Sequence, residues 1–289
     1  MQKWSENFLR SVSHPAVIYM AEKLQPPCVN FDAKLNRLKA NVVLSTLVDR
    51  DDYEEISWDY MVDKKTESNF LQKIKQSFDI IASTQMGRDI LSGIHSSTYF
   101  GIAPMEQQGL FFDRAYPTIF LNSSEDIFKN STLVLKILIH ECTHAKNVEV
   151  GQRSNTCILP PRLMFMQYML NELSAYLSEH IVLSQRKDKN FTASCQTQSQ
   201  VIDCLDHLCD VDYIKDFSGR VIRWNRGGIL QPESKIFTPS HLAIFAYYFK
   251  KYPALCDLAV IGKLNQLYHH HVIRIVRGQK TGLSRQMVR

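Results

Sequence analysis

The sequence lacks the features that mark membrane and secreted proteins. No run of about 18 apolar residues occurs among its 289 residues, which excludes a membrane-spanning helix. The first 25 residues have no uninterrupted apolar core and no small-residue cleavage site, so we expect them to form an ordinary first helix and not a signal peptide. The sequence therefore predicts a cytoplasmic protein without membrane insertion.

Cysteine patterns typical of disulfide frameworks are also missing. The seven cysteines are odd in number and scattered along the chain, which favours free thiols in a reducing compartment. Cys204, His207 and Cys209 lie close in sequence, but zinc sites do not commonly use this spacing, and no second pair matches it. We expect this segment to form a buried helix face.

Excess positive charge is confined to the C-terminal end. The net charge is +5, and residues 270–289 hold five basic residues and no acidic one, so the rest of the chain is neutral. Nucleic-acid-binding folds normally carry a basic stripe across their surface. The distribution predicts no nucleic-acid partner and a solvated basic tail over 272–289, with a tail that contacts an acidic partner as the alternative.

Apolar periodicity predicts mostly helices, with one short region of strands. Residues 97–104 and 109–122 are rich in β-branched and aromatic side chains, which is typical of strands. We therefore predict a predominantly helical α+β fold with a small mixed sheet, an N-terminal helical region over 1–84 and a larger domain over 85–271. The predicted helices cover about 4–24, 33–49, 67–94, 132–148, 161–185, 198–217, 239–251 and 253–271, and residues 218–239 form a long loop.

The segment that carries chemistry is H-E-C-T-H, residues 140–144. Helix positions four apart lie about 40° apart around the axis, so His140 and His144 project side by side and both rings can reach one metal ion. Glu141 is rotated by about 100° from His140, a direction that suits a base acting on water better than a metal ligand. The pattern predicts a catalytic zinc site.

Most of the surface of the motif helix is apolar, which indicates a buried helix. Two histidines and a glutamate at such a place must be hydrogen-bonded or bound to an ion, because leaving them unsatisfied is costly. The competing interpretation is a pair of core histidines that are hydrogen-bonded to carbonyl groups. Asn130 and the following Ser and Thr residues offer caps for the start of this helix.

A catalytic zinc needs a third protein ligand and one open position. A histidine at the H-x-x-G-x-x-H spacing is ruled out, because Asn147 and Val150 stand where that pattern has glycine and histidine. Glu172 in the next long helix follows His144 by 28 residues, which leaves room for the chain to turn back. We predict Glu172 as the third ligand, with Glu179 as the main alternative and Glu149 too close to the end of the motif helix.

The segment "HECTH" followed by "NELSAY" (171–176) resembles the H-E-x-x-H zinc metallopeptidases of the gluzincin-like branch of the zincins. The resemblance covers about residues 85–180. It implies a zincin-like core, one catalytic Zn²⁺ held by His140, His144 and Glu172, and Glu141 as base and proton shuttle. "TQMGRDIL" with the following strands is also faintly similar to small bacterial effector metallopeptidases, which implies delivery to a host cell by a route independent of a signal peptide.

These observations predict a hydrolase that cleaves a protein or peptide substrate at peptide bonds. Extended residues 115–122 could pair with the substrate backbone by strand addition. Two alternatives remain open: a zincin-fold protein that serves as an interaction scaffold without proteolysis, and a helical binding module without metal. No diagnostic motif marks the residue that stabilises the transition state. The candidates are Tyr176 and His241, together with Tyr168, Tyr213 and the histidines at 269–271.

Overall fold

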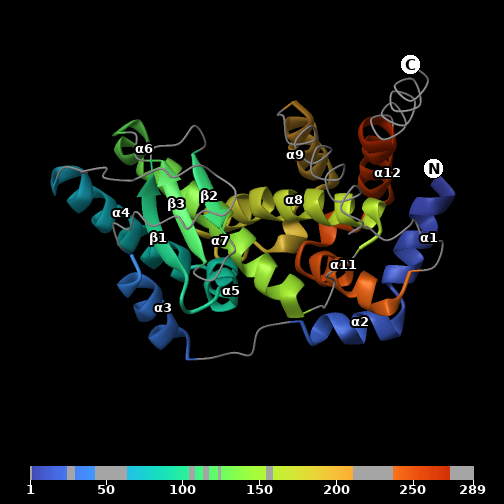
Figure 1. Cartoon of the computed structure of the whole chain (residues 1–289), viewed down its shortest axis with the longest axis horizontal. Coiled ribbons are helices and arrows are strands. Elements are labelled where there is room, and N and C mark those ends of the chain that lie inside the picture. Colours follow the sequence, from blue (N-terminus) through green and yellow to red (C-terminus); the bar gives the residue numbers. More distant parts are fainter. Residues whose placement is uncertain are drawn as a thin grey trace, which may run out of the picture. The chain divides into compact units, whose positions relative to one another are not determined.

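The computed structural model of the chain describes residues 2–24, 30–42, 64–103, 108–112, 117–122, 125–153, 159–210 and 237–273. This part is predominantly helical and contains a small three-stranded sheet (Figure 1), which confirms the α+β class. The chain divides into two compact units. The first comprises Met1–Gln25, Val150–Leu177 and Thr192–Arg289, and the second comprises Pro26–Glu149 and Ser178–Phe191. The predicted boundaries after residues 84 and 271 stay predictions.

The sheet of the second unit consists of β1 (Tyr99–Ala103), β2 (Gly109–Phe112) and β3 (Thr118–Asn122) in the order β1-β3-β2. The central strand β3 is parallel to β1 and antiparallel to β2. Both edges of β3 are therefore occupied by neighbouring strands. The prediction that residues 115–122 add a substrate strand is wrong for β3, because its backbone groups are already paired.

Four helices of the second unit precede or follow the sheet: α3 (Phe31–Ala40), α4 (Lys64–Ala82), α5 (Gln85–Gly93) and α6 (Glu125–Lys129). One helix was predicted over 67–94, but the chain breaks it into α4 and α5. Thr84 makes the break, because its hydroxyl oxygen accepts a hydrogen bond from the N–H of Gly87 and caps α5. The predicted apolar stripe of α4 is confirmed as core: Phe70, Ile74, Phe78 and Ile81 are fully buried.

In the first unit α1 (Gln2–Val12) and α2 (Pro15–Glu22) replace the single helix that was predicted over 4–24. The break falls at Pro15, which has no N–H to continue a helix but suits a first helical position. His14 caps the new helix through its ring Nδ1, which accepts from the N–H of Ala16.

The remaining helices of the first unit follow the predicted positions closely. The helix predicted over 253–271 instead starts as a 3-10 turn, and α12 begins only after Asp257, whose carboxylate caps the N–H of Ala259. Tyr213 and residues 218–236 of the predicted loop lie outside the described residues, as does the tail from 274. The bounds are α9 (Gln198–Asp210), α11 (Pro239–Lys251), α12 (Leu258–Leu267) and a π-helical turn (Tyr268–Ile273), with 3-10 turns at Ala193–Cys195 and Pro253–Leu255.

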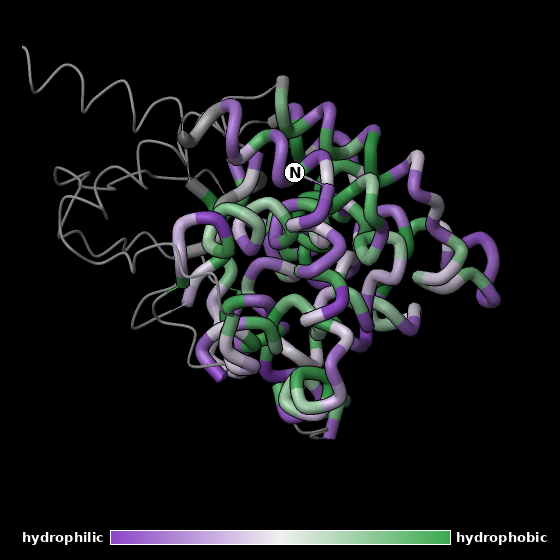
Figure 2. Tube along the Cα trace, turned by 90° about the vertical axis from the view of Figure 1, so that its right-hand side faces the viewer, coloured by the Kyte–Doolittle hydropathy of each residue, from purple (hydrophilic) through white to green (hydrophobic). Residues whose placement is uncertain are grey.

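Two long helices, α7 (Ser131–Arg153) and α8 (Pro161–Gln185), carry the residues of the predicted metal site. Hydrophobic and hydrophilic residues alternate along many of the helices (Figure 2). In α8 most residues from Leu163 to Val182 are buried, which fits a helix that is covered on most sides. Among the described residues, no helix is long and apolar enough to cross a membrane.

Candidate metal centre

The motif helix α7 begins at Ser131 because Asn130 caps it. The side-chain oxygen of Asn130 accepts hydrogen bonds from the N–H groups of Thr132 and Leu133, each at 3.1 Å. This confirms the predicted cap. The apolar residues of the helix are buried as predicted, among them Val134, Leu138 and Ile139 at 0% exposure. Because α7 is capped at its N-terminus and buried along its length, the motif residues have fixed positions.

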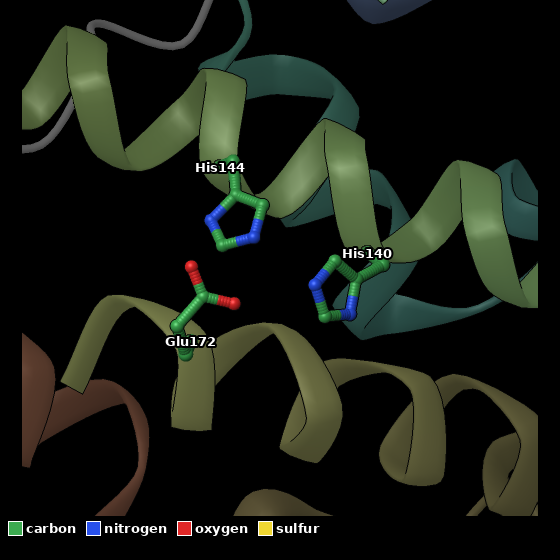
Figure 3. A group of neighbouring side chains, drawn as sticks. All are labelled: His140, His144 and Glu172. Carbon is green, nitrogen blue, oxygen red and sulfur yellow. The ribbon is translucent and has the colours of Figure 1, made fainter. Parts of the chain in front are cut away.

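His140 and His144 lie one turn apart on α7 with their rings close together. The ring centroids are 4.7 Å apart and the ring planes meet at 75°. Figure 3 shows both rings directed toward the carboxylate of Glu172 on α8. The side chain of His140 is 13% exposed and His144 is also partly buried. The helical spacing thus places the two imidazoles as the sequence predicted.

Glu172 completes the group. One ligand atom from each of His140, His144 and Glu172 lies within 4.8 Å of the others, and Glu172 is 7% exposed. In the described part of the chain this is the one group of His, Cys, Asp and Glu side chains that could hold a metal ion. Buried polar side chains are costly unless they are hydrogen-bonded or bound to an ion. One carboxylate and two imidazoles at the same place are ligands that a metal cation prefers.

Glu179, the alternative ligand, has a different position. Its Oε1 lies 2.8 Å from Nδ1 of His140, and the two side chains are 16% and 13% exposed. A carboxylate accepts a hydrogen bond from Nδ1–H, which fixes the tautomer and the orientation of the imidazole. Metal-binding histidines commonly make such a bond through the nitrogen that does not face the metal.

Glu141 lies beside the triad and faces β2. It is 8% exposed. A Cβ atom at Gly109, the first residue of β2, would lie 3.0 Å from both Cγ and Oε1 of Glu141 and 2.4 Å from Cγ2 of Ile137. Only glycine fits at this position without displacing its neighbours. The strand backbone therefore approaches the Glu141 carboxylate closely, a contact that the sequence did not suggest.

Two further groups near the motif have raised pKa values. Burial, and then the charge of Glu141, raises the pKa of the Cys142 thiol well above its ordinary value of 9.0. Burial, followed by the neighbouring Tyr247 and Tyr252 and then by Glu172, raises the pKa of Tyr248. Cys142 is therefore a neutral thiol in this environment, and it is not part of the group formed by His140, His144 and Glu172. Tyr248 lies within electrostatic range of Glu172. The sequence did not single out Tyr248, because the residues from 242 to 249 are all apolar or aromatic core residues without a distinguishing pattern.

The two main candidates for stabilising the transition state lie on different helices, Tyr176 on α8 together with Glu172, and His241 on α11. The ring of Tyr176 packs edge-on against His207 of α9, with centroids 5.8 Å apart. His241 stands in the first turn of α11, where its N–H is bonded to Thr238 Oγ1, and its ring Nδ1 is buried without a hydrogen-bond partner among the described residues. Their catalytic role stays a prediction.

The centre brings together two imidazoles, the three carboxylates of Glu141, Glu172 and Glu179, and a closely approaching strand. Three of these groups could bind a metal ion, one orients a histidine, and Glu141 is left beside them. No protein-family model matches the chain, and comparison with curated proteins and with solved structures finds no match.

Proposed function

We propose that the chain is a zinc-dependent metallopeptidase with a zincin-like core. The observation that carries the proposal is the gathering of His140, His144 and Glu172 within 4.8 Å, with Glu141 next to His140 on the same helix. Catalytic zinc takes three protein ligands of these types and leaves a fourth position open. The resemblance of "HECTH" and "NELSAY" to gluzincin-like enzymes supports the same function.

Glu141 favours hydrolysis over other metal chemistry. Two histidines and one carboxylate also suit Fe(II) in oxygenases, so the ligand set alone does not decide. A buried carboxylate beside the ligands is what a hydrolase needs for proton transfer. Since Glu141 lies outside the group of three, we assign it this role and not that of a ligand.

Each residue has a defined task in peptide hydrolysis. His140, His144 and Glu172 would hold the zinc ion, which when bound would polarise the peptide carbonyl as a Lewis acid and lower the pKa of a water molecule. The Glu141 carboxylate takes the proton of the attacking water and delivers it to the nitrogen of the leaving amine. Glu179 holds Nδ1 of His140, which would leave the other ring nitrogen of His140 available to a bound metal.

The strand β2 offers an edge with which the backbone of a substrate could pair. In the described part of the chain β2 pairs only with β3. The N–H of Asn122 donates to the carbonyl of Gln108 at 3.0 Å, so the backbone groups of Gln108 face β3. In an antiparallel pair, successive residues of a strand turn their backbone groups to opposite sides. The backbone groups of Gly109 and Phe111 therefore face the edge of β2 that is away from β3. Gly109 is also the residue next to Glu141. An extended peptide paired with this edge would lie beside the base, which makes a flexible protein segment the proposed substrate.

The Glu141→Gln variant tests the proposal. We expect it to keep zinc and to lose cleavage by a factor of about 10²–10⁴, because glutamine cannot accept the proton. New N-termini formed in a proteome by the wild type should be missing with Glu141→Gln. The matched control is Glu149→Gln, which removes the same charge from the same helix. Wild-type cleavage by Glu141→Gln would refute the assigned role.

The same comparison separates the enzyme from a zincin-fold interaction scaffold. A scaffold would bind zinc and produce no new N-termini with either protein. Retention of Glu141 beside the ligands favours the enzyme, since a scaffold has no use for a base. The delivery of the protein to a host cell, implied by its similarity to bacterial effector metallopeptidases, stays a prediction.

A further inference from the structure

A buried lysine lies on the motif helix on the side away from the metal ligands. Lys146 is 1% exposed, and helix geometry places it about 200° around the axis from His144. Its Nζ lies 2.5 Å from Oδ2 of Asp89 on α5. A lysine is rarely buried unless it is paired, so α7 and α5 are joined by an ion pair at this point.

The surface of α5 is shaped to take the lysine. A Cβ atom at Gly93 would lie 2.5 Å from Cγ and 3.0 Å from Cδ of Lys146. The stem of Lys146 therefore runs directly along the backbone of α5, and a larger residue at position 93 would displace it. The two helices are therefore joined by close packing of the Lys146 stem on Gly93 in addition to the ion pair.

The other end of α5 is bonded to α8. The N–H of Met86 donates to Oε1 of Gln185 at 2.9 Å, and Gln185 in turn donates from Nε2 to the carbonyl of Phe191 at 2.9 Å. Gln185 is 8% exposed. It stands in the last turn of α8, six residues after Glu179. One short helix thus binds α7 through Asp89 and α8 through Met86.

These contacts close a ring through three helices of the second unit. Lys146 joins α7 to α5, Met86 joins α5 to Gln185 on α8, and Glu179 on α8 returns to His140 on α7. The two ends of the ring on α7 are Lys146 and His140. If α7 shifts against α5, then either α8 must shift as well or the hydrogen bond between Glu179 and His140 must change its geometry.

We infer that α5 is a brace for the metal centre and that Lys146 is a positioning residue, which acts on the ligand His140 through Asp89, Gln185 and Glu179. The inference rests on the proposed metal site and adds the part of the molecule that holds it in shape. A buried ion pair contributes little to the free energy of folding. We therefore assign the Lys146–Asp89 pair the role of fixing how α7 is rotated relative to α8.

Lys146→Met tests the brace with the protein itself and Zn²⁺. Methionine keeps the length of the stem, and Asp89 is 29% exposed and can be hydrated, so we expect the variant to fold. Competition with a chelator should show zinc binding weakened about 10–100-fold, the range seen when groups behind a ligand are removed. Lys136→Met, an exposed lysine on the same helix, is the control and should stay within about twofold.

A second readout separates positioning from a merely structural role. In ¹⁵N-labelled metal-free protein the Nδ1–H of His140, held by Glu179, should give a proton signal that Glu179→Ala abolishes. Lys146→Met should shift or broaden this signal, whereas a structural ion pair would change only the thermal midpoint. Gln185→Met removes the hydrogen bond at the other end of α5 and should change zinc affinity and the His140 signal in the same way. The effects of Lys146→Met and Gln185→Met should be less than additive in the double variant.

Unchanged zinc affinity together with an unchanged His140 signal in Lys146→Met would overturn the inference. Should Lys146→Met fail to fold, Asp89→Asn decides by the same two measurements, because it removes the charge and keeps an acceptor. A wild type that binds no zinc would overturn the proposed function instead. The His140 signal would still test the brace in that case.

Discussion

Nδ1 of His140 lies 2.8 Å from Oε1 of Glu179, across a separation of 39 residues in the chain. Both residues were candidate metal ligands, and the structure gives them different positions. His140 joins His144 and Glu172, whereas Glu179 holds the His140 ring from the other side. A change at Glu179 should therefore alter metal affinity without removing a ligand.

Glu179→Ala should weaken zinc binding about 10–100-fold, because His140 loses the acceptor that fixes its ring. Glu179→Gln retains an acceptor and should lose less. Chelator competition measures both affinities, and Glu149→Ala is the control for the lost charge. If Glu179→Ala bound zinc as tightly as the wild type, the hydrogen bond would have no part in the site.

Gly109→Ala should reduce cleavage and leave zinc bound. The added methyl group would lie 2.4 Å from Ile137 and 3.0 Å from the Glu141 carboxylate, so the base or the strand must move. A displacement of about 1 Å can lower the rate on the order of 100-fold. Gly262→Ala is the matched control, since nothing lies within 4 Å of its added atom. Full activity of Gly109→Ala would contradict the close approach of β2 to Glu141.

Cys142 should resist alkylation in the native protein up to about pH 9, while the exposed Cys195 and Cys256 react. Its pKa is raised in the folded state, so the stability it contributes is complete below the unfolded pKa and falls as the pH rises above about 8.5. Denaturant titrations from pH 7 to 10 should show a smaller loss of stability in Cys142→Ala than in the wild type. Rapid labelling of native Cys142 would contradict this burial.

Asn130→Ala should destabilise the protein by about 1 kcal/mol, because the first N–H groups of α7 lose their cap. Asn130→Asp retains the acceptor and serves as the control. Urea unfolding measures the free energy of unfolding for both variants. Equal loss in the two would show that the side-chain oxygen is not what starts the motif helix.

Local sequence patterns were sufficient for much of the fold. Helical spacing placed Phe70, Ile74 and Phe78 in the core, and the caps and apolar residues of α7 and α8 set helices close to the predicted bounds. His140 and His144 meet because one helix fixes both. Their spacing is a local property, so the sequence could predict it.

Contacts between distant residues could not be read from the sequence in the same way. The order of the strands depends on which edges meet, and nothing in residues 118–122 shows that β3 is central. Lys146 looked like any polar helix residue, since its partner Asp89 is 57 residues away. Gly109 gave no signal either, because its importance lies in the space that Glu141 occupies beside it.

The amount of zinc bound to the purified protein decides whether His140, His144 and Glu172 form a zinc site. Metal analysis of the wild type should find about one zinc per chain, and Glu172→Gln, which removes a charged ligand, should bind far less after the same dialysis. Glu149→Gln, purified in parallel, should retain the metal. Less than about 0.3 zinc per chain in the wild type after purification with added zinc would contradict the account.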